Sequence, residues 1–328
     1  MQRILLVKTT SLGDVIHCLP AASDIARLYP EAAIDWVVEE TYVDVVRLHP
    51  AIARVLPVAV RRWRRSLRAR QTRDEFAAFR QQLAQAQYDR VIDVQGLAKS
   101  AFLARLATGE RHGLDRASAR EWIAALTYHR RHHVPWTLGA VARNRQLVGD
   151  ALGYAPQGAP DFGIAAAPAR FDWLPASRYC VCLTGTTDVA KLWPEERWGE
   201  LGRDLAAAGW RCVFPAGTDG ERARAGRIAA AVDASGAAAV VAPAASLGEL
   251  AGVLAGADLA IGVDTGLTHL AAALGRPTVG IYCGTSPRAT GVIGTRVCNV
   301  GDVAKTPTSA AVRDAAASLA EIAAPVCP

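Results

Sequence analysis

The chain has 328 residues, of which 51% are apolar, and its mean hydropathy is +0.13. This length and composition indicate a folded protein with room for two domains, and the lack of any apolar run near eighteen residues excludes a membrane-spanning helix. The net charge of +6 is uneven: residues 1–160 hold 23 Lys or Arg and 15 Asp or Glu, whereas residues 161–328 hold 14 and 16. The basic surplus of the first half predicts an anionic partner there.

The first half alternates apolar strands with helical patterns. Strands are expected at Ile4–Val7, Ile34–Val38, Arg54–Val60 and Arg90–Val94. The apolar segment at Ile4–Val7 is too short for a signal peptide, so a strand is expected there instead. Helices are expected after the first strand, over residues 74–86 and from about Lys99. Because each strand is followed by a helix, we expect a parallel sheet with crossover helices.

The second half repeats this scheme after a Pro-, Gly- and Ala-rich linker over residues 154–178. Strands are expected at Tyr179–Leu183, Arg211–Phe214, Val240–Ala242, Leu259–Val263 and Thr278–Tyr282, and a final helix over about 309–323. The expected architecture is an α/β fold with two Rossmann-like domains, residues 1–165 and 166–328, that face a central cleft. Whether the last helix packs back on the first domain is left open.

The seven cysteines lie at 18, 180, 182, 212, 283, 298 and 327, and no two of them form a C-x-x-C pair. Their odd number and scattered spacing predict free, mostly buried thiols in a reducing cytosol.

The most informative stretch is Val263-Asp264-Thr265-Gly266-Leu267-Thr268-His269-Leu270. It joins a buried strand to a helix, so its backbone N–H groups are unpaired at the helix start and suit an anion. Asp264, Thr265, Gly266 and His269 are therefore candidate ligand-binding residues. The alternative is that Asp264 only caps the helix.

Two other loops end strands in the same way. Thr186, Thr187 and Lys191 follow the first strand of the second half, where two hydroxyls and an ammonium suit a diphosphate. Asp14 lies in the loop after the first strand of the chain. Its alternative role is that of an acid in the first turn of a helix.

Basic runs mark the first half. Arg61–Arg70 contains six arginines and no acid, which predicts a site for phosphate, carboxylate or a lipid headgroup unless the run is only a solvated face. A metal site among His129, His132 and His133 is not expected, because neighbouring arginines oppose a cation. There is no G-x-G-x-x-G, no P-loop motif and no D-x-D pair, so neither a dinucleotide fold nor a metal clamp is indicated.

Taken together these motifs resemble the ADP-heptose:lipopolysaccharide heptosyltransferases, glycosyltransferase family nine, over nearly the whole chain. The resemblance is carried by VKTTSLGDVIHCLPA, DWVVEE, VAVRRWRR, VIDVQGLAKS, SARE, TTDVAKLWPEERW and VDTGLTHLAAALGRPT, which begin at residues 7, 35, 58, 91, 118, 186 and 263. It implies a GT-B fold in which the second domain binds the sugar donor and the first binds the acceptor.

The resemblance also implies a role for individual residues. It makes Asp14 the general base and places Lys191 beside the leaving group. Donor-binding positions would be Thr186, Thr187, Lys191, Glu221, Ala245, Asp264, Thr265, Gly266 and His269, and acceptor-binding positions Ser11, Gly13, Arg61, Arg62, Arg64, Arg65, Lys99 and Arg120. The sequence departs from the family at Ala245, where a compared member has Met, and at Cys283-Gly284, where Gly-Pro is usual.

The implied reaction moves L-glycero-D-manno-heptose, with inversion, from ADP-heptose to the Kdo of Kdo2-lipid A, as the first heptose of the lipopolysaccharide inner core. No metal, no cofactor and no nucleic-acid partner are expected, and the protein is expected on the cytoplasmic face of the inner membrane. The alternatives are a type II heptosyltransferase or another transferase of this family, and a non-catalytic nucleotide- or phospholipid-binding module.

Overall fold

The structure is a computed structural model that describes residues 2–234 and 238–320. The chain divides into two compact units, one ending at Ile164 and the other beginning at Ala165. Each unit holds a six-stranded sheet in which all neighbouring strands are parallel. Residues 153–178, between the last helix of the first unit and the first strand of the second, form no helix or strand.

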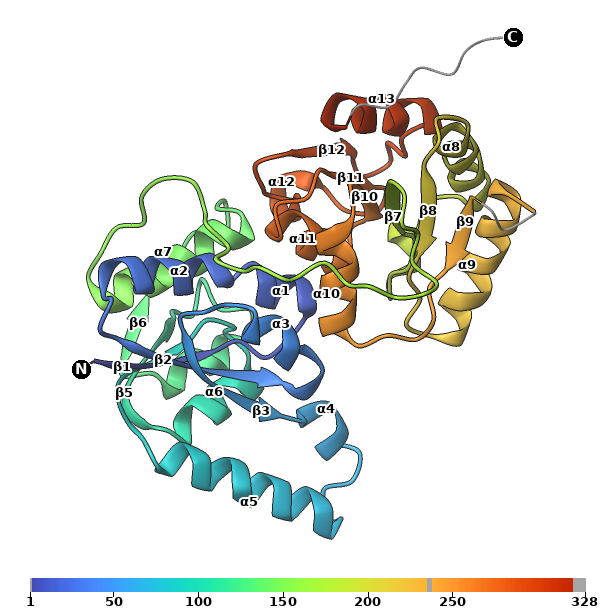
Figure 1. The fold of residues 1–328 in the computed structure, drawn as a ribbon. Coiled ribbons are helices and arrows are strands. Elements are labelled where there is room, and N and C mark those ends of the chain that lie inside the picture. The colour runs from blue at the N-terminus through green and yellow to red at the C-terminus, as the bar shows by residue number, and fades with distance from the viewer. Residues whose placement is uncertain (1, 235–237, 321–328) are drawn as a thin grey trace. The chain divides into compact units, whose positions relative to one another are not determined.

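The sheet of the first unit has the order β3-β2-β1-β4-β5-β6. Its strands are β1 Arg3–Val7, β2 Ala33–Glu39, β3 Ile52–Val58, β4 Gln87–Asp93, β5 Thr108–Leu114 and β6 Arg130–His132. The helices are α1 Leu12–Ile16, α2 Leu19–Leu28, α3 Val43–Arg47, α4 Val60–Trp63, α5 Arg70–Ala84, α6 Ala98–Arg105 and α7 Ala140–Leu152, with 3-10 turns η1 Glu40–Tyr42 and η2 Trp122–Thr127. Figure 1 shows α2 and α7 on one face of this sheet and α5 and α6 on the other.

The sheet of the second unit has the order β12-β11-β10-β7-β8-β9. Its strands are β7 Tyr179–Leu183, β8 Arg211–Phe214, β9 Ala239–Val241, β10 Leu259–Val263, β11 Thr278–Tyr282 and β12 Val297–Gly301. The helices are α8 Glu195–Ala207, α9 Asp219–Val232, α10 Leu247–Gly256, α11 Gly266–Ala273, α12 Pro287–Thr290 and α13 Ser309–Leu319, with the 3-10 turn η3 Val189–Lys191. Helix α13 packs on α8 and on strands β10 to β12 of its own unit, and the predicted extension of this helix to 323 lies outside the described residues.

Central strands are buried on both faces, which explains their unbroken apolar sequences. In β1, residues Ile4–Val7 are buried and only Arg3, at the start of the strand, is partly exposed. All five residues of β10 are buried. In the second unit the core is built on Trp193, Trp198 and Trp210, with the rings of Trp193 and Trp198 in edge contact at 5.0 Å between centroids. Such large aromatic side chains bury more area than any aliphatic residue.

Several boundaries differ from the sequence prediction. The strand predicted at Arg54–Val60 ends at Val58, because Val60 begins α4, and the helix predicted from residue 74 begins at Arg70. The prediction also missed β5, β6 and β12. Strands β5 and β6 are rich in His, Arg and Gly, so they lack the apolar signal by which a buried strand is recognised.

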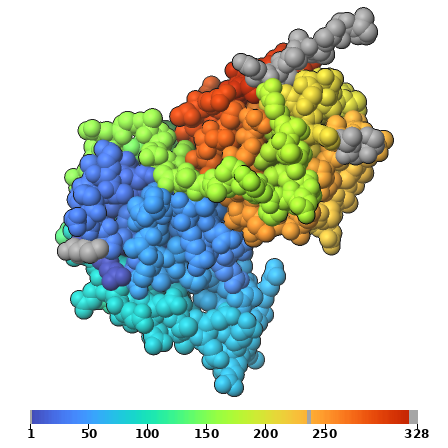
Figure 2. All heavy atoms as spheres, in the orientation of Figure 1, coloured from blue at the N-terminus to red at the C-terminus, as the bar shows by residue number. Residues whose placement is uncertain are grey.

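The short helix α4 and the beginning of α5 lie at the surface of the first unit, where Figure 2 shows this segment, in light blue, as a projection. Residues 64–71 are all exposed there, and so is Arg73, which follows buried Thr72. This segment contains most of the predicted run of arginines.

Of the cysteines, Cys18, Cys180, Cys182 and Cys212 are buried and Cys283 and Cys298 are partly buried, all of them as free thiols. Cys327 lies outside the described residues.

Candidate active site

The second unit has its topological switch point between β7 and β10, which are neighbours although the chain leaves them in opposite directions across the sheet. In open parallel sheets the crevice at the carboxyl ends of two such strands is where ligands bind. Asp264 follows β10 directly, and the loop Thr184–Ala190 follows β7. The fold therefore brings together the two loops that the sequence singled out in this unit.

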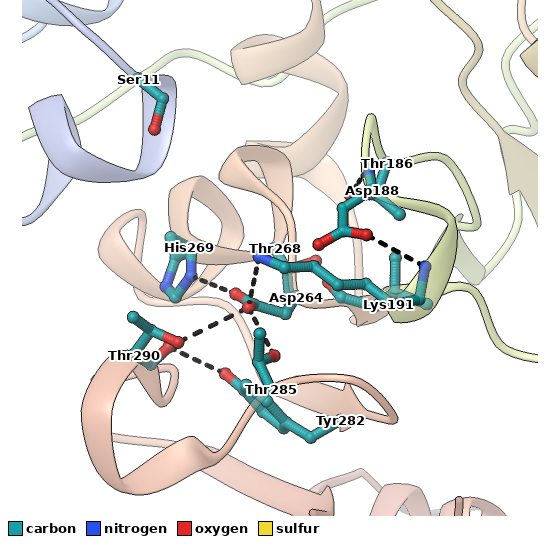
Figure 3. A network of polar contacts seen from close by, with 12 residues as sticks. Ser11, Thr186, Asp188, Lys191, Asp264, Thr268, His269, Tyr282, Thr285 and Thr290 are labelled. Carbon is teal, nitrogen blue, oxygen red and sulfur yellow. Dashed lines mark hydrogen bonds and ion pairs between the residues drawn. The ribbon is translucent and has the colours of Figure 1, made fainter. Parts of the chain in front are cut away.

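Asp264 is the centre of a polar network at this point (Figure 3). Its Oδ2 accepts hydrogen bonds from Lys191 Nζ at 2.8 Å and from the Thr285 hydroxyl at 2.8 Å, and lies 3.5 Å from the Thr290 hydroxyl. His269 Nε2 lies 3.3 Å from the other oxygen, Oδ1. One carboxylate thus holds an ammonium, an imidazole and hydroxyls from three different segments.

The same contacts set the charge of Asp264. Its side chain is only 6% exposed, and burial by itself raises the pKa of a carboxyl group. Hydrogen bonds from His269, Lys191 and Thr285 outweigh burial and hold the pKa of Asp264 well below its usual range. Asp264 is therefore an anion at neutral pH, and its side chain does not cap α11, whose N-cap residue is Thr265.

Loops after β7 and β8 also meet. Glu221, in the first turn of α9, accepts hydrogen bonds at Oε2 from the backbone N–H groups of Gly217 and Thr218, at 2.9 and 3.1 Å. A side chain at Gly185 would place its Cβ 2.7 Å from Glu221 Oε1. The glycine therefore allows the β7 loop to approach this carboxylate.

The structure places the remaining predicted donor residues around the same edge of the sheet. Thr265 and Gly266 form the start of α11. Thr186 accepts a long 3.5 Å hydrogen bond from the N–H of Asp188, and Thr187 is exposed beside it. Ala245 immediately precedes Ser246, the N-cap of α10. Lys191 and His269 thus each contact Asp264 directly, whereas the others lie in neighbouring segments.

Thr285 and Thr290 were missed as site residues by the sequence analysis, which noted only that this loop departs from the family pattern. Both hydroxyls reach Asp264 Oδ2 from the segment that follows β11. Because β11 is the neighbour of β10 in the sheet, the position of this loop after a strand was the signal that could have identified them.

The first unit has a corresponding switch point between β1 and β4. The two strand ends are tied by Gln95, which accepts hydrogen bonds at Oε1 from Thr9 N (2.8 Å) and Thr9 Oγ1 (2.7 Å) and donates to Thr10 Oγ1 (3.0 Å). Lys8 Nζ donates to the Val94 carbonyl at 3.3 Å, and Lys99 Nζ to Thr10 Oγ1 at 2.9 Å. Two of the chain's four lysines therefore converge on this edge.

Asp14 lies in the first turn of α1, where the charge of Lys8 acts on it. Its Oδ2 accepts hydrogen bonds from the Ser11 backbone N–H at 3.0 Å and the Ser11 hydroxyl at 2.9 Å. Burial by itself raises the pKa of Asp14. The charges of Lys8 and Arg120 and the hydrogen bonds from Ser11 lower it by more than burial raises it, so the pKa of Asp14 lies below the ordinary value. The structure thus gives Asp14 both the helix-start role and a place in a cationic environment.

The predicted acceptor arginines are not equivalent. Arg62 is held by Glu40 at 2.9 Å and by Glu75 at 3.0 Å, whereas Arg61, Arg64 and Arg65 are exposed. Burial lowers the pKa of Lys99, and the nearby charges of Arg61 and Arg64 lower it more, against an opposing effect of Glu39. Arg64 and Lys99 line the same cavity, while Arg62 is occupied within the fold.

Glu39 is a second buried carboxyl group that sequence analysis did not single out. Its Oε1 accepts a hydrogen bond from the backbone N–H of Arg61 at 3.0 Å, while Oε2 is buried without a hydrogen-bond partner among the described residues. Burial raises the pKa of Glu39 above its ordinary value. Placed at the end of β2, it fixes the start of the arginine segment to the sheet.

Within residues 2–234 and 238–320, no three His, Cys, Asp or Glu side chains are grouped so that they could hold a metal ion. Among the helices in these ranges, none has the length and apolar character needed to cross a membrane.

The family model of glycosyltransferase family 9 (heptosyltransferase) matches residues 76–317 of this chain. Over 301 residues the chain is 46% identical to a lipopolysaccharide heptosyltransferase 1 of Pseudomonas aeruginosa, covering 91% of this chain and 83% of that protein. It is 45% identical to the lipopolysaccharide heptosyltransferase 1 of Escherichia coli K12, covering 89% of this chain and 90% of that protein. The chain belongs to glycosyltransferase family 9.

Solved structures of this family agree. The E. coli heptosyltransferase WaaC with ADP is 42% identical and superposes with a TM-score of 0.87 over 95% of this chain and 98% of that one. The same enzyme with ADP-2-deoxy-2-fluoro heptose gives a TM-score of 0.83 at 41% identity, over 95% and 98% of the two chains. The fold is thus of the GT-B type, and this member of family 9 is a glycosyltransferase of the heptosyltransferase group.

Proposed function

We propose that this protein transfers L-glycero-D-manno-heptose from ADP-heptose to the Kdo of Kdo2-lipid A, the first heptose of the lipopolysaccharide inner core. The observation that carries the proposal is the Lys191–Asp264–His269 network at the start of α11, in a chain that is 44–46% identical to lipopolysaccharide heptosyltransferases 1 of three species. A cation and a helix start at one strand end suit the diphosphate of a sugar nucleotide.

In this proposal the second unit binds the donor without a metal or a cofactor. Lys191 and the N-terminus of α11 stabilise the negative charge that develops on the departing ADP. Asp264 holds Lys191 in place and, with His269, faces the sugar nucleotide. The residues that complete the donor site are Thr186, Thr187, Glu221, Ala245, Thr265 and Gly266.

The first unit supplies the base and binds the acceptor. Asp14 accepts the proton of a Kdo hydroxyl as that oxygen attacks the anomeric carbon of the heptose; the bond from this carbon to ADP breaks, and ADP leaves with the bonding electrons. Attack opposite the leaving group inverts the anomeric configuration. Positioned bases of this kind accelerate reactions by about 10²–10⁴-fold.

Anionic groups of the acceptor are bound in this proposal by Ser11, Gly13, Arg61, Arg64, Arg65, Lys99 and Arg120, whereas Arg62 is held by Glu40 and Glu75. The acceptor lipid lies in a bilayer, so the enzyme works as a peripheral protein on the cytoplasmic face of the inner membrane. The first-half charge surplus of +8 favours approach to that anionic surface.

Release of ADP from ADP-heptose, measured with and without Kdo2-lipid A, tests the proposal. We expect release only when the acceptor is present. Release that needs an acceptor already carrying one heptose would indicate the later transferase of the same family, whose E. coli structure, heptosyltransferase II, is 19% identical with a TM-score of 0.79. Binding of ADP-heptose without turnover on either acceptor would indicate a non-catalytic module.

A further inference from the structure

A cavity of about 350 Å³ opens at the surface of the first unit between α4, α5 and α6. Its wall is formed by Val60, Trp63, Leu67, Phe76, Phe102 and Leu103. The ring of Phe76 lies edge-on to Trp63, at 5.9 Å, and is stacked on Phe102, at 6.3 Å between centroids. A volume above roughly 300 Å³ is enough for a small ligand.

This apolar surface is not closed off from water. Leu67 is 68% exposed and Phe102 is 53% exposed, although both line the cavity. Single exposed apolar residues are common, but a cavity whose aromatic lining continues to an exposed Leu and Phe is typical of a binding site.

The charges at this cavity are all of one sign. Arg64, Arg73 and Lys99 line it, and no acidic residue does. Arg65 and Arg68, on either side of Leu67 in the sequence, are exposed as well. An apolar seat bordered only by cations is complementary to a ligand with a hydrocarbon chain and an anionic head, and to neither a neutral nor a cationic one.

We propose that this cavity, called here the α4–α6 cavity, receives an acyl chain of an anionic bilayer phospholipid while Arg64, Arg73 and Lys99 contact its headgroup phosphate. Leu67, between basic residues on an exposed turn, would enter the interface beside that chain, as apolar residues of peripheral proteins do. One buried chain gives only marginal binding, and a basic patch supplies the second contribution that stable anchoring needs.

The inference rests on the proposed function in one respect, namely that the acceptor is a bilayer lipid. It adds which part of the chain meets the bilayer and which lipid class is bound. Arg64 and Lys99 belong to the proposed acceptor site as well, so Leu67, Arg73 and Phe102 are the residues that distinguish the cavity from that site.

Vesicle binding tests the apolar part. The full-length protein is co-sedimented with vesicles of phosphatidylcholine and phosphatidylglycerol, or of phosphatidylcholine alone, without any Kdo2-lipid A. We expect binding to the anionic vesicles, and a loss of at least about tenfold for the double variant Leu67→Gln/Phe102→Gln, the factor for one large apolar side chain that stays in water. Leu28→Gln is the matched control, because Leu28 is a 40% exposed leucine on α2 of the same unit.

Two further variants test the charged part. Arg73→Gln should weaken binding to the anionic vesicles and leave the small residual binding to phosphatidylcholine unchanged. Arg80→Gln removes the same charge from the same helix, α5, at an exposed position outside the cavity, and should have a smaller effect. An unchanged ADP-induced rise in melting temperature shows that each variant is folded.

Trp63 reports on occupation of the cavity itself. Phosphatidylglycerol with brominated acyl chains should quench a part of the tryptophan fluorescence that is missing in Trp63→Phe. The proposal is overturned if Leu67→Gln/Phe102→Gln and Leu28→Gln bind alike, if the bromine effect is the same with and without Trp63, or if binding requires Kdo2-lipid A, in which case the cavity belongs to the acceptor. These vesicles contain neither substrate, so a failed heptose transfer would be seen separately, in the ADP-release assay.

Discussion

Asp264 and Lys191 form an ion pair at the centre of the proposed donor site, and their charges cannot be considered separately. Their atoms are 2.8 Å apart, with Lys191 25% and Asp264 6% exposed. Removing the cation from such a pair leaves a largely buried anion, and breaking a fully buried pair costs about 3–5 kcal/mol. His269 and Thr285 still bind Asp264, so we expect a smaller effect.

For Lys191→Met we therefore predict a loss of about 1–3 kcal/mol in the free energy of unfolding, together with weaker ADP-heptose binding and slower turnover. Chemical denaturation and steady-state kinetics measure these. Lys305→Met is the matched control, since Lys305 is an exposed lysine of the same unit, and should change neither. A double variant with Asp264→Asn should be less destabilised than the sum of the two single changes; additive losses would mean that the pair does not act as a unit.

The pH dependence of stability follows from the pKa of Asp264. Its pKa in the folded protein is held well below the usual range, so the stabilising contribution is present above the unfolded value of about 3.9 and is lost as the pH falls through the folded value. We predict that wild-type and Asp264→Asn proteins differ in stability at neutral pH and converge in strong acid. Unfolding curves over this range check it, and a constant difference at all pH values would contradict the assignment.

Asp14 has two candidate roles that one substitution can separate. Asp14→Asn keeps an oxygen that can accept the hydrogen bonds of Ser11, now made at 3.0 and 2.9 Å, but it cannot take up a proton. If Asp14 is the base, kcat falls by at least about 10²-fold while ADP affinity is retained. If it serves only the helix start, stability falls by at most about 1 kcal/mol and kcat stays near wild type.

Asp44→Asn is the control for Asp14→Asn, because Asp44 is also a partly buried acid in the first turn of a short helix of this unit, α3. It should leave kcat unchanged. The low pKa of Asp14 further means that the base is ionised throughout the neutral range, so an acid limb in kcat/KM due to this residue should appear only below the ordinary carboxyl pKa of about 3.9.

At the level of elements, α4 shows why a run of arginines cannot be interpreted from the sequence alone. Arg62 lies between Glu40 and Glu75. Its hydrogen bond to Glu75 is the largest of the effects that lower the pKa of Glu75 to about 2. Trp63 donates to the same Glu75 at 2.6 Å. Arg62 therefore links α4 to α5 and η1, whereas Arg61, Arg64 and Arg65 are exposed.

We predict that the triple variant Arg61→Gln/Arg64→Gln/Arg65→Gln raises KM for Kdo2-lipid A at an unchanged melting temperature and unchanged ADP affinity. Exposed charges are screened over about 10 Å at 0.1 M salt, so added salt should raise KM more in the wild type than in this variant. Arg62→Gln, the same change within the same arginine run, should instead lower the melting temperature. Equal salt sensitivity of wild type and triple variant would mean that these arginines form only a solvated surface.

The elements around the site were predictable to the extent that their sequence was regular. Strands such as β10 are continuous apolar runs that end at Asp264, so both the strand and the loop beyond it could be placed. Strands β5 and β6 could not, because their polar side chains find partners only in the folded sheet, as in the His112–His132 contact at 3.0 Å and the Arg130–Glu110 ion pair at 2.9 Å. Such pairing depends on neighbours in space, which a single sequence does not reveal.

The same holds for the site itself. Lys191, Asp264 and His269 could be named because they stand at strand ends or one helical turn beyond them. Thr285 and Thr290 are tied to the site by their contacts with Asp264, and the occupation of Arg62 depends on two acids at distant positions, Glu40 and Glu75. Sequence patterns gave the edge of the sheet, and tertiary contacts decided which side chains are engaged there.

For the molecule as a whole, the division of chemistry between two units predicts that nucleotide binding is separable from acceptor binding. The predicted donor residues lie in the second unit, in the loops and helix starts that follow β7, β8, β9 and β10, and the predicted acceptor residues lie in the first. Arginine changes on α4 should therefore leave ADP binding intact, and Lys191→Met should leave vesicle binding intact. If each variant lost both ADP binding and vesicle binding, the result would indicate a general loss of folding.

The last prediction is that ADP binds and stabilises the full-length protein without a metal ion. Lys191 and the start of α11 supply positive charge at the switch point of the second unit, in the place that a divalent cation takes beside a diphosphate in other enzymes. At an ADP concentration of one hundred times Kd, binding should add about 2.7 kcal/mol to the free energy of unfolding. The rise in melting temperature should be the same in EDTA and in magnesium. AMP, which lacks the β-phosphate, should stabilise less, and this difference should shrink in Lys191→Met if the lysine contacts that phosphate. A stabilisation by ADP that disappears in EDTA would contradict the metal-free site and would require a cation between Lys191 and the nucleotide.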